Sequence, residues 1–332
     1  MDRLTAQLIR GEEKHAHWAR AYETTSFSLT AMGEYLGIAR GQVHWKDYGG
    51  EGRLIVMVHG LGGSVANWDL IGPRLAEGAR VVAVDLPGFG LSPPGPDWSL
   101  ETLSAAVTEF ITHFGDSAVL FGNSLGALLS EMVASSHPRL VDALVLISPA
   151  TPPRLPDPHI HWPTARHLII SALPGVGPAY TRRTVRRLTS QELIDQTLRR
   201  ITDQPERIPP ELVDTFVSMV ETRRRLPWSA NAVPMTGKSI RRLFLRPSRL
   251  VSMIREIRAP TMVVQGAGDQ IVSPNSVSWL CSLRPDWRLV HMEDTGHTPQ
   301  IDAPDRLLEI VRPWLDEVLG QSAPDRDAAR VT

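Results

Sequence analysis

The chain has 332 residues, of which 42% are hydrophobic and 21% charged, and its formal net charge is −1. This length allows one large domain or two and is ample for a buried core. The near-neutral charge gives no support for nucleic-acid binding. The single cysteine, Cys281, excludes an internal disulfide, and its apolar helical surroundings predict a buried, inert thiol.

The first twenty residues are rich in charged side chains, with no apolar run of signal-peptide length, and no stretch of the chain reaches the length of a membrane span. We therefore expect a cytoplasmic protein without a transmembrane segment, for which peripheral membrane contact stays open. Residues 1–39 are predicted to be an arm, formed by a weakly amphipathic helix and a connecting segment, to which we assign no chemistry. At the other end, residues 320–332 are predicted to be a flexible tail.

A regular alternation of strands and helices follows the arm. Residues 41–48 alternate apolar and polar side chains, which is typical of an edge strand. Residues 54–58 and 81–84 are continuous apolar runs, as expected of parallel strands buried on both faces. Later strands are predicted at 118–121, 143–147, 261–266 and 288–292, and helices at 99–114, 127–133, 274–283 and 304–319. This spacing predicts an α/β fold with a mostly parallel sheet flanked by helices.

The alternation stops at residue 150 and resumes at residue 261. The intervening stretch is rich in proline and shows helical patterns at about 180–202, 210–226 and 236–256, without a convincing strand. An unstructured segment of this length would be unusual inside a compact domain. We therefore divide the chain into a core at 1–150, an inserted helical cap at 151–258 and the second part of the core at 259–319.

The predicted cap is basic and the remainder of the chain is acidic. Residues 151–258 contain 19 Lys and Arg against 9 Asp and Glu, a net charge of +10, whereas the other residues contain 16 against 27, a net charge of −11. Opposite charges would favour docking of the cap on the core. The same charge could instead attract anionic substrates or a lipid surface.

One turn carries the first candidate for chemistry. Residues 122–126 read Gly-Asn-Ser-Leu-Gly, directly after an apolar run and directly before a helical pattern. A serine at the apex of such a strand-turn-helix usually has a strained backbone, for which only small neighbours leave room. Ser124 is therefore a candidate nucleophile.

A serine hydroxyl needs a base within hydrogen-bonding reach, and that base needs a group that fixes its tautomer. Asp269 and His297 each follow a predicted strand, as Ser124 does. The carboxyl ends of parallel strands meet at one rim of the sheet, so we expect these three residues to lie together. Asp85, which also follows a strand, and Asp294, three residues before His297, are alternative acids.

Four other histidines are not expected to take part in the chemistry. His59 stands in a His-Gly turn, where ordering of the loop is the expected role rather than that of a base. His159, His161 and His167 stand in a proline-rich part of the predicted cap and are interpreted as loop residues rather than as metal ligands. We therefore expect no metal and no cofactor.

Four motifs, in this order, carry a family resemblance. They are His-Gly-Leu-Gly-Gly at 59–63, Asp-Leu-Pro-Gly-Phe-Gly-Leu-Ser at 85–92, Gly-Asn-Ser-Leu-Gly at 122–126, and the Gly-Asp and Gly-His pairs at 268–269 and 296–297. From about residue 41 to 319 the chain resembles the cap-bearing enzymes of the α/β-hydrolase superfamily. The resemblance implies that Ser124 is the nucleophile, His297 the base and Asp269 the acid. It also implies an oxyanion hole formed by the backbone N–H groups of Leu61 and Leu125.

The resemblance also bears on the reaction. Related dehalogenases and epoxide hydrolases have aspartate at the apex, so a serine favours an acyl-enzyme route and hydrolysis of a carboxylic ester. Carbon–carbon bond hydrolases of ring-cleavage products share the Gly-Asn-Ser sequence and are the main alternative. The resemblance implies, however, that those enzymes have glycine at the position of Ala127 and tryptophan at the position of Thr298. Thioesterases, amidases, lactonases and acyltransferases use the same catalytic residues. A non-catalytic binding protein is an alternative of a different class, because a fold does not determine a function.

The cap is expected to set specificity by covering the rim. Its aliphatic and aromatic residues favour a small-molecule ester or acyl substrate that is largely apolar, although most of them are expected to form the cap's own core. We predict that Phe216, Trp228 and Thr298 line the substrate pocket. The sequence indicates no oligomeric state.

Overall fold

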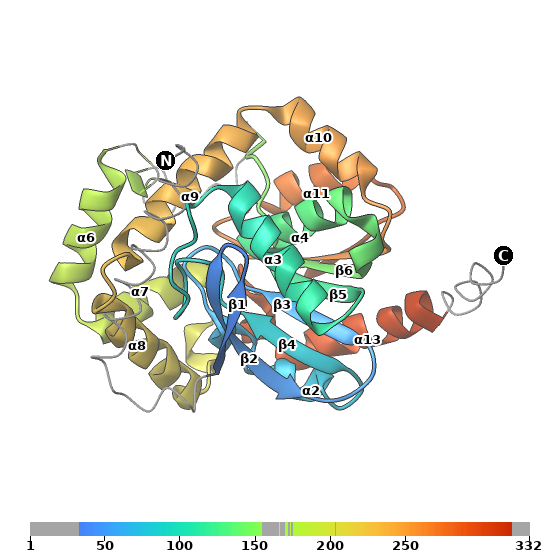
Figure 1. Cartoon of the computed structure of the whole chain (residues 1–332), viewed down its shortest axis with the longest axis horizontal. Coiled ribbons are helices and arrows are strands. Elements are labelled where there is room, and N and C mark those ends of the chain that lie inside the picture. The colour runs from blue at the N-terminus through green and yellow to red at the C-terminus, as the bar shows by residue number, and fades with distance from the viewer. Residues whose placement is uncertain are drawn as a thin grey trace, which may run out of the picture.

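The computed structural model describes residues 33–154, 166, 170–171, 173, 175–202 and 204–320. An eight-stranded sheet forms its centre, in the order β1-β2-β4-β3-β5-β6-β7-β8 (Figure 1). The strands are β1(Glu34–Ile38), β2(Gly41–Gly49), β3(Leu54–Val58), β4(Arg80–Val84), β5(Ala118–Asn123), β6(Val141–Ile147), β7(Thr261–Gly266) and β8(Arg288–Met292). The strands from β4 to β8 in this order are parallel, whereas β1 and β2 are antiparallel to their neighbours. The predicted mostly parallel sheet is therefore confirmed.

The first two strands correct the prediction for this part of the chain. Residues 34–38, which the sequence pattern places in the arm, form β1, and β2 lies between β1 and β4 rather than at the edge. The residues of β1 are exposed or half-buried, so the strand depends on main-chain pairing with β2 and carries little apolar periodicity. That is why the sequence pattern does not reveal it.

Apolar side chains on both faces of the parallel strands form the core. Val56 and Val58 of β3 point into one cluster, and Ile55 and Met57 point into the other, as the alternation of side chains along a strand requires. Helices α3(Leu100–Phe114), α4(Leu125–Ser136) and α11(Pro274–Ser282) cover the first face, and α2(Gly72–Leu75) and α13(Pro304–Gly320) cover the second (Figure 1). This three-layer body fixes the ends of the strands, where the candidate residues lie.

A helical insertion separates β6 from β7, and five of its α-helices have described bounds. They are α6(Gly177–Arg187), α7(Ser190–Ile201), α8(Pro210–Arg224), α9(Ser229–Phe244) and α10(Pro247–Glu256), and we call them the insertion. The helix predicted at 180–202 is two helices, because Thr189 caps α7 by accepting a hydrogen bond from the backbone N–H of Glu192. The helix predicted at 236–256 is also two, because Pro247 opens α10 and cannot continue α9.

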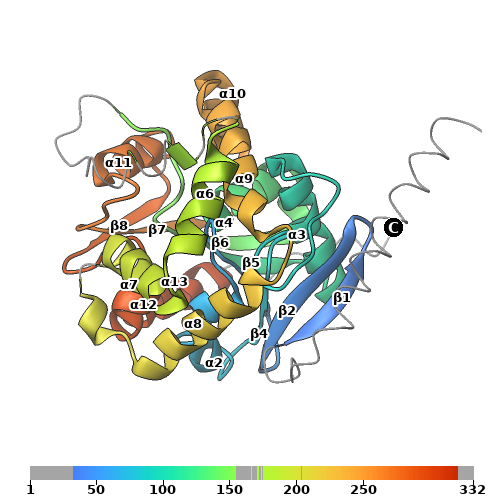
Figure 2. The ribbon, with the colours of Figure 1, turned by 90° about the vertical axis from the view of Figure 1, so that its left-hand side faces the viewer.

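The insertion packs on the body in two places. Ala232 and Leu243 of α9 and Leu250 and Ile254 of α10 belong to the first core cluster, and α7 and α8 form a smaller apolar cluster with the body. Side chains of α7 and α8, among them Leu198 and Phe216, contact Ala66 in the 3-10 helix η2(Val65–Trp68) and Ile301 in α12(Pro299–Asp302). Figure 2 faces the insertion and shows α6, α7, α8 and α9 in front of the sheet. Because η2 and α12 follow the loops after β3 and β8, the insertion is docked beside two of the candidate catalytic loops.

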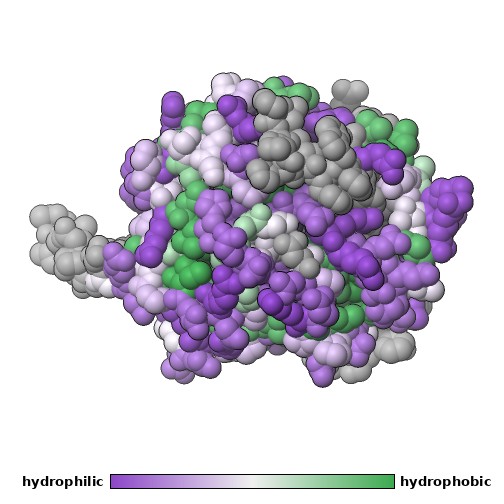
Figure 3. Space-filling model, turned by 180° about the vertical axis from the view of Figure 1, so that it is seen from behind, coloured by the Kyte–Doolittle hydropathy of each residue, from purple (hydrophilic) through white to green (hydrophobic). Residues whose placement is uncertain are grey.

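The surface is mixed in character. On the face shown in Figure 3, small green apolar patches are separated by purple hydrophilic residues. Within the described residues, the structure contains no helix with the length and apolar character needed to cross a bilayer.

Candidate active site

Ser124 occupies a sharp turn between β5 and α4. Its backbone has φ 53° and ψ −110°, and its N–H donates to the carbonyl of Ile147 at 2.9 Å. A Cβ atom on Gly126 would lie 1.9 Å from the carbonyl oxygen of Val58, so only glycine fits there. Positive φ is strained for a residue with a side chain and is typical of functional turns. The turn places Ser124 at the start of α4, where the N–H of Leu125 has no partner within the helix.

His297 and Asp269 are hydrogen bonded, with Nδ1 and Oδ2 2.8 Å apart. Asp269 also accepts from the side-chain amide of Gln265 at 3.0 Å and from the backbone N–H groups of Ile271 and Val272 at 2.8 and 2.9 Å. Burial by itself would raise the pKa of Asp269, but the charge and hydrogen bond of His297 and these backbone donors lower it below its ordinary value. An ionised carboxylate only accepts, so the His297 proton is assigned to Nδ1 and Nε2 is left as the acceptor.

The loop of His297 touches the serine turn directly. The side-chain amide of Asn123 donates to the carbonyl of His297 at 3.1 Å and to that of Ile147 at 3.2 Å. At the end of β7, a Cβ atom on Gly266 would lie 1.9 Å from the carbonyl oxygen of Gly296. The loops after β5, β7 and β8 are therefore in contact, and Ser124, Asp269 and His297, all buried, lie at one rim as predicted.

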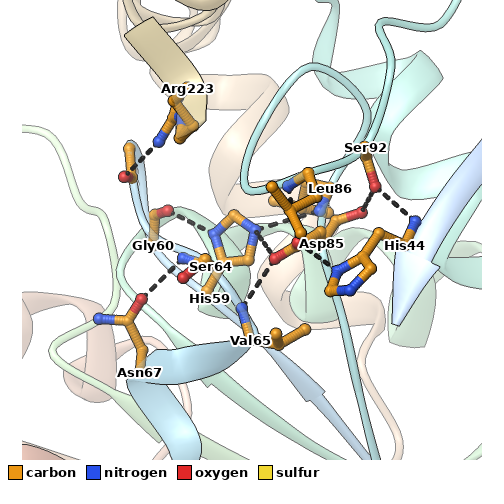
Figure 4. Close-up of polar contacts among 12 residues, drawn as sticks. His44, His59, Gly60, Ser64, Val65, Asn67, Asp85, Leu86, Ser92 and Arg223 are labelled. Carbon is orange, nitrogen blue, oxygen red and sulfur yellow. Dashed lines mark hydrogen bonds and ion pairs between the residues drawn. The ribbon is translucent and has the colours of Figure 1, made fainter. Parts of the chain in front are cut away.

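His59 orders the loop that contains Leu61. Its Nδ1 donates to the carbonyl of Gly60 at 2.7 Å, and its Nε2 accepts from the backbone N–H of Leu86 at 3.1 Å (Figure 4). Burial lowers the pKa of His59, although the nearby Asp85 charge opposes this effect. Both ring nitrogens are occupied by main chain, so His59 has the loop-ordering role expected from the sequence.

Asp85 is the centre of a separate buried network. It accepts from Nδ1 of His44 at 2.6 Å, from the backbone N–H of Val65 at 2.7 Å and from that of Leu91 at 2.8 Å (Figure 4). Burial would raise the pKa of Asp85, but the hydrogen bond and charge of His44 lower it. Asp85 thus ties β2, η2 and the loop at 85–92 together behind the site.

The three candidate carboxylates lie in different surroundings. Asp269 is bonded to His297, whereas the carboxylate of Asp85 accepts from donors of its own network. Asp294 is exposed and has φ 54° in the turn after β8. Of the three carboxylates, only that of Asp269 is hydrogen bonded to His297.

The insertion reaches both candidate catalytic loops. The carbonyl of Ile201, at the end of α7, accepts from the backbone N–H of His297 at 2.7 Å and from Oγ1 of Thr298 at 3.2 Å. In α8, Nη1 of Arg223 donates to the carbonyl of Gly62 at 3.0 Å, in the loop of Leu61 (Figure 4). These bonds join residues far apart in sequence.

The predicted pocket residues are all buried, and their lining role stays a prediction. Phe216 lies in the cluster between the insertion and the body, Trp228 precedes α9, and Thr298 is bonded to Ile201. His159, His161 and His167 of the predicted cap lie outside the described residues. Within those that are described, no group of three His, Cys, Asp or Glu side chains could hold a metal ion.

Several residues that shape the site are not evident from the sequence. In the sequence, Asn123 is only one residue of a motif and Gln265 only one residue of a predicted strand. Ile201 and Arg223 belong to predicted helices of the insertion and carry no signal of their own. The position of Asn123 next to Ser124 is the one available signal. Ile201 acts through its main-chain carbonyl, which no side-chain pattern can reveal.

Comparisons with known proteins identify the family and the fold. The alpha/beta hydrolase fold family matches residues 53–304. A pimeloyl-[acyl-carrier protein] methyl ester esterase of Aromatoleum aromaticum is 28% identical over 257 residues, which cover 76% of this chain and 93% of that protein.

Two solved structures are similar in fold. A putative lipase of Acinetobacter baumannii has a TM-score of 0.68 at 20% identity, covering 87% of this chain and 92% of its own. A meta-cleavage product hydrolase, CumD, has a TM-score of 0.67 at 21% identity, covering 86% and 98%. At these identities the likeness establishes the shared fold.

Proposed function

The chain belongs to the α/β-hydrolase family, and we propose that it hydrolyses carboxylic esters through an acyl-enzyme intermediate on Ser124. The observation that carries the proposal is the bond between Nδ1 of His297 and Asp269, beside the strained turn of Ser124. This bond leaves Nε2 of His297 as a proton acceptor, which a serine nucleophile requires. The esterase among the similar proteins supports the same reaction class.

In the proposed first half-reaction, Oγ of Ser124 attacks the ester carbonyl and transfers its proton to Nε2 of His297. The tetrahedral intermediate carries a negative oxygen, to which the backbone N–H groups of Leu61 and Leu125 donate. The intermediate collapses when the alkoxide leaves and takes the proton from His297. Asp269 holds the imidazole in the required tautomer and stabilises the imidazolium that forms.

Water completes the proposed cycle. It attacks the acyl carbonyl, gives its proton to Nε2 of His297 and forms a second tetrahedral intermediate at the same two N–H groups. Ser124 then leaves with the proton from His297, and the carboxylic acid is released. The net reaction converts one ester and one water into an acid and an alcohol. The cap, residues 151–258, is proposed to select the substrate.

The test combines turnover with labelling. Purified protein should hydrolyse p-nitrophenyl esters and react covalently with a fluorophosphonate at Ser124, and Ser124→Ala should abolish both. An absence of turnover across short and long acyl chains, together with an absence of labelling, would overturn the proposal in favour of a binding protein on this fold.

A second candidate function is hydrolysis of a carbon–carbon bond in a ring-cleavage product. The Gly-Asn-Ser sequence at 122–124 and the similar fold of the meta-cleavage product hydrolase favour it. Ala127 and Thr298 count against it, because the resemblance implies glycine and tryptophan there. A ring-cleavage dienoate in the substrate panel separates the two candidates, since only the second predicts that it is turned over faster than the esters.

A further inference from the structure

The insertion holds the loop of His297 at a single main-chain atom. The carbonyl oxygen of Ile201 accepts both the backbone N–H of His297 at 2.7 Å and the hydroxyl of Thr298 at 3.2 Å. His297 is also held at its carbonyl group, which accepts a hydrogen bond from the side-chain amide of Asn123 at 3.1 Å. The backbone of His297 is therefore clamped between the insertion and the serine turn.

Gly296 allows this close approach. A Cβ atom at Gly296 would lie 2.7 Å from the carbonyl oxygen of Ile201 and 2.9 Å from Cα of Thr202. Both of those atoms are backbone, so they cannot move aside as a flexible side chain could. The end of α7 thus fits against the His297 loop only because position 296 has no side chain.

The insertion holds the second loop through a charged donor. The guanidinium of Arg223 donates to the carbonyl of Gly62 at 3.0 Å, one residue after Leu61 (Figure 4). Gly62 has φ +84°. A Cβ atom on Gly62 would lie 3.6 Å from Cγ2 of Val233, a residue of the insertion. A hydrogen bond from a cation is stronger than one between neutral groups. Arg223 is therefore well suited to fix the direction in which the N–H of Leu61 points.

We propose that Arg223 and Thr298 are positioning residues through which the docked insertion sets the geometry of the oxyanion loop and of the His297 loop. The insertion then acts on the chemical step itself as well as on the choice of substrate. The inference rests on the proposed function, because it assigns a role to bonds around the proposed base and oxyanion hole. Small displacements of such groups have large effects on rate, about 10²-fold for 1 Å.

Because apolar contacts also join the insertion to the body, the positioning role of Arg223 and Thr298 can be tested separately from the docking of the insertion. Leu198, Leu212 and Phe216 are buried in a cluster with Ala66 and Ile301 that contains neither Arg223 nor Thr298. Loss of either polar contact should therefore loosen a catalytic loop while the insertion stays docked.

The experiment compares Arg223→Met and Thr298→Val with two matched variants. Arg183→Met removes the same charge from an exposed position on α6, and Thr298→Ser keeps the hydroxyl donor that valine lacks. Each protein is assayed with p-nitrophenyl acetate, whose small acyl group makes few contacts with the cap, and by the rate of fluorophosphonate labelling at Ser124. Hydrogen exchange of the segments 59–64 and 295–299 is measured in parallel.

We expect kcat and the labelling rate to fall together by about tenfold in Arg223→Met and Thr298→Val, with KM nearly unchanged. Thr298→Ser should recover most of the kcat lost in Thr298→Val, and Arg183→Met should behave as the unchanged protein does. Exchange should become faster at 59–64 in Arg223→Met and at 295–299 in Thr298→Val. If Arg223→Met does not fold, the valine and serine variants of Thr298 decide alone.

Other outcomes overturn the inference or the proposed function separately. Unchanged kcat, labelling and exchange in both variants would show that the insertion does not position the loops. A change in KM alone would show that the insertion contributes to substrate binding but not to the chemical step, which would also refute the inference. An unchanged protein that neither turns over esters nor reacts at Ser124 would refute the proposed function, and in that case the exchange data would still test the two contacts.

Discussion

The body and the insertion are held together in different ways. Strands β3, β5 and β7 are buried along their whole length, with apolar side chains packed on both faces of the sheet. In the insertion, α6 buries only Gly177, and α10 buries only Leu250 and Ile254. The exposed large hydrophobic residues of the described chain, which are Leu173, Val176, Met235 and Leu245, all lie within or beside the insertion helices.

This difference separates two tasks. A densely packed sheet holds the ends of its strands in fixed positions, which suits residues that must stay aligned for chemistry. Helices with few buried contacts open at lower free energy, which suits an element that must admit and release a substrate. Through the hydrogen bonds of Ile201 and Arg223, the insertion acts on the body in the proposed positioning of the two loops. Substitutions in each region should therefore have effects of different kinds and sizes.

The largest expected effect is on catalysis, at a residue of the body. Asn at position 269 would present an amide N–H₂ or a neutral oxygen to His297 and would no longer fix its tautomer. Asp269→Asn should lower kcat by about 10⁴-fold, as loss of the acid does in a serine triad. The measurement is steady-state hydrolysis of p-nitrophenyl acetate, with Asp294→Asn as the control. If Asp269→Asn keeps a tenth of the activity, the assigned acid is wrong.

The next effect compares the packing of the two regions. Phe121 of β5 is fully buried in the body, so Phe121→Ala should reduce the free energy of unfolding by about 3–5 kcal/mol. Phe216 is 8% exposed and lies in the smaller cluster at the insertion, where neighbours can relax into the space. Phe216→Ala should therefore cost about 3 kcal/mol or less. Denaturant unfolding measures both, and equal costs would contradict the difference in packing.

The same contrast explains what the sequence could predict. Strands buried on both faces leave continuous apolar runs, and the bounds predicted for two of them, 54–58 and 261–266, are those that the structure has. The bounds predicted at 288–292 also agree, although this edge strand is mostly exposed or half-buried. The turn of Ser124 and the loop of Asp269 follow such strands directly, and the loop of His297 follows the edge strand β8. The residues that lie at the rim were thus predictable from local pattern and strand order.

Features that depend on pairing or on helix ends were harder to predict. The strand β1 is defined by its hydrogen bonds to β2, and the insertion helices divide at Thr189 and Pro247, where capping and proline chemistry override a continuing apolar pattern. The contact of Ile201 with the His297 loop involves a main-chain carbonyl and leaves no trace in the side chains.

The charge difference between the predicted cap and the rest of the chain indicates only part of how the two are joined. Docking by opposite charges was one expectation, and Arg249 of α10 does pair with Glu101 of α3 at 3.0 Å. Both side chains of this pair are largely exposed, and such pairs add little to stability. Arg223 instead donates to a main-chain carbonyl, a partner that a count of charges cannot predict.

A buried glutamate in the body gives a pH-dependent prediction. Glu131 of α4 is completely buried, neither of its carboxylate oxygens has a hydrogen-bond partner among the described residues, and burial raises its pKa to about 8. The folded state therefore holds this proton more tightly than the unfolded state does. The stability that results is present below the ordinary pKa of glutamate and is lost as the pH rises towards 8.

Substitution of Glu131 should remove this dependence. Glu131→Gln keeps the shape of the side chain and cannot ionise, so between pH 5 and 8.5 it should gain roughly 4 kcal/mol relative to the unchanged protein. The measurement is the free energy of unfolding at several pH values, with the exposed Glu317→Gln as the control. Parallel curves for the unchanged protein and Glu131→Gln would show that Glu131 does not titrate in this range.

The smallest expected effect concerns the insertion and the choice of substrate. If Trp228 and Phe216 line the acyl pocket, alanine at either position should change the ratio of kcat/KM between short and long acyl chains by about tenfold, because each apolar contact in a pocket discriminates by roughly 1–3 kcal/mol. The rate of fluorophosphonate labelling at Ser124 should change little, in contrast to the effects expected for Arg223 and Thr298. Leu245→Ala, at a residue that is 76% exposed in the same region, is the control. An unchanged acyl-chain profile in both variants would mean that these side chains only pack the insertion, and the specificity of the enzyme would then have to come from the body.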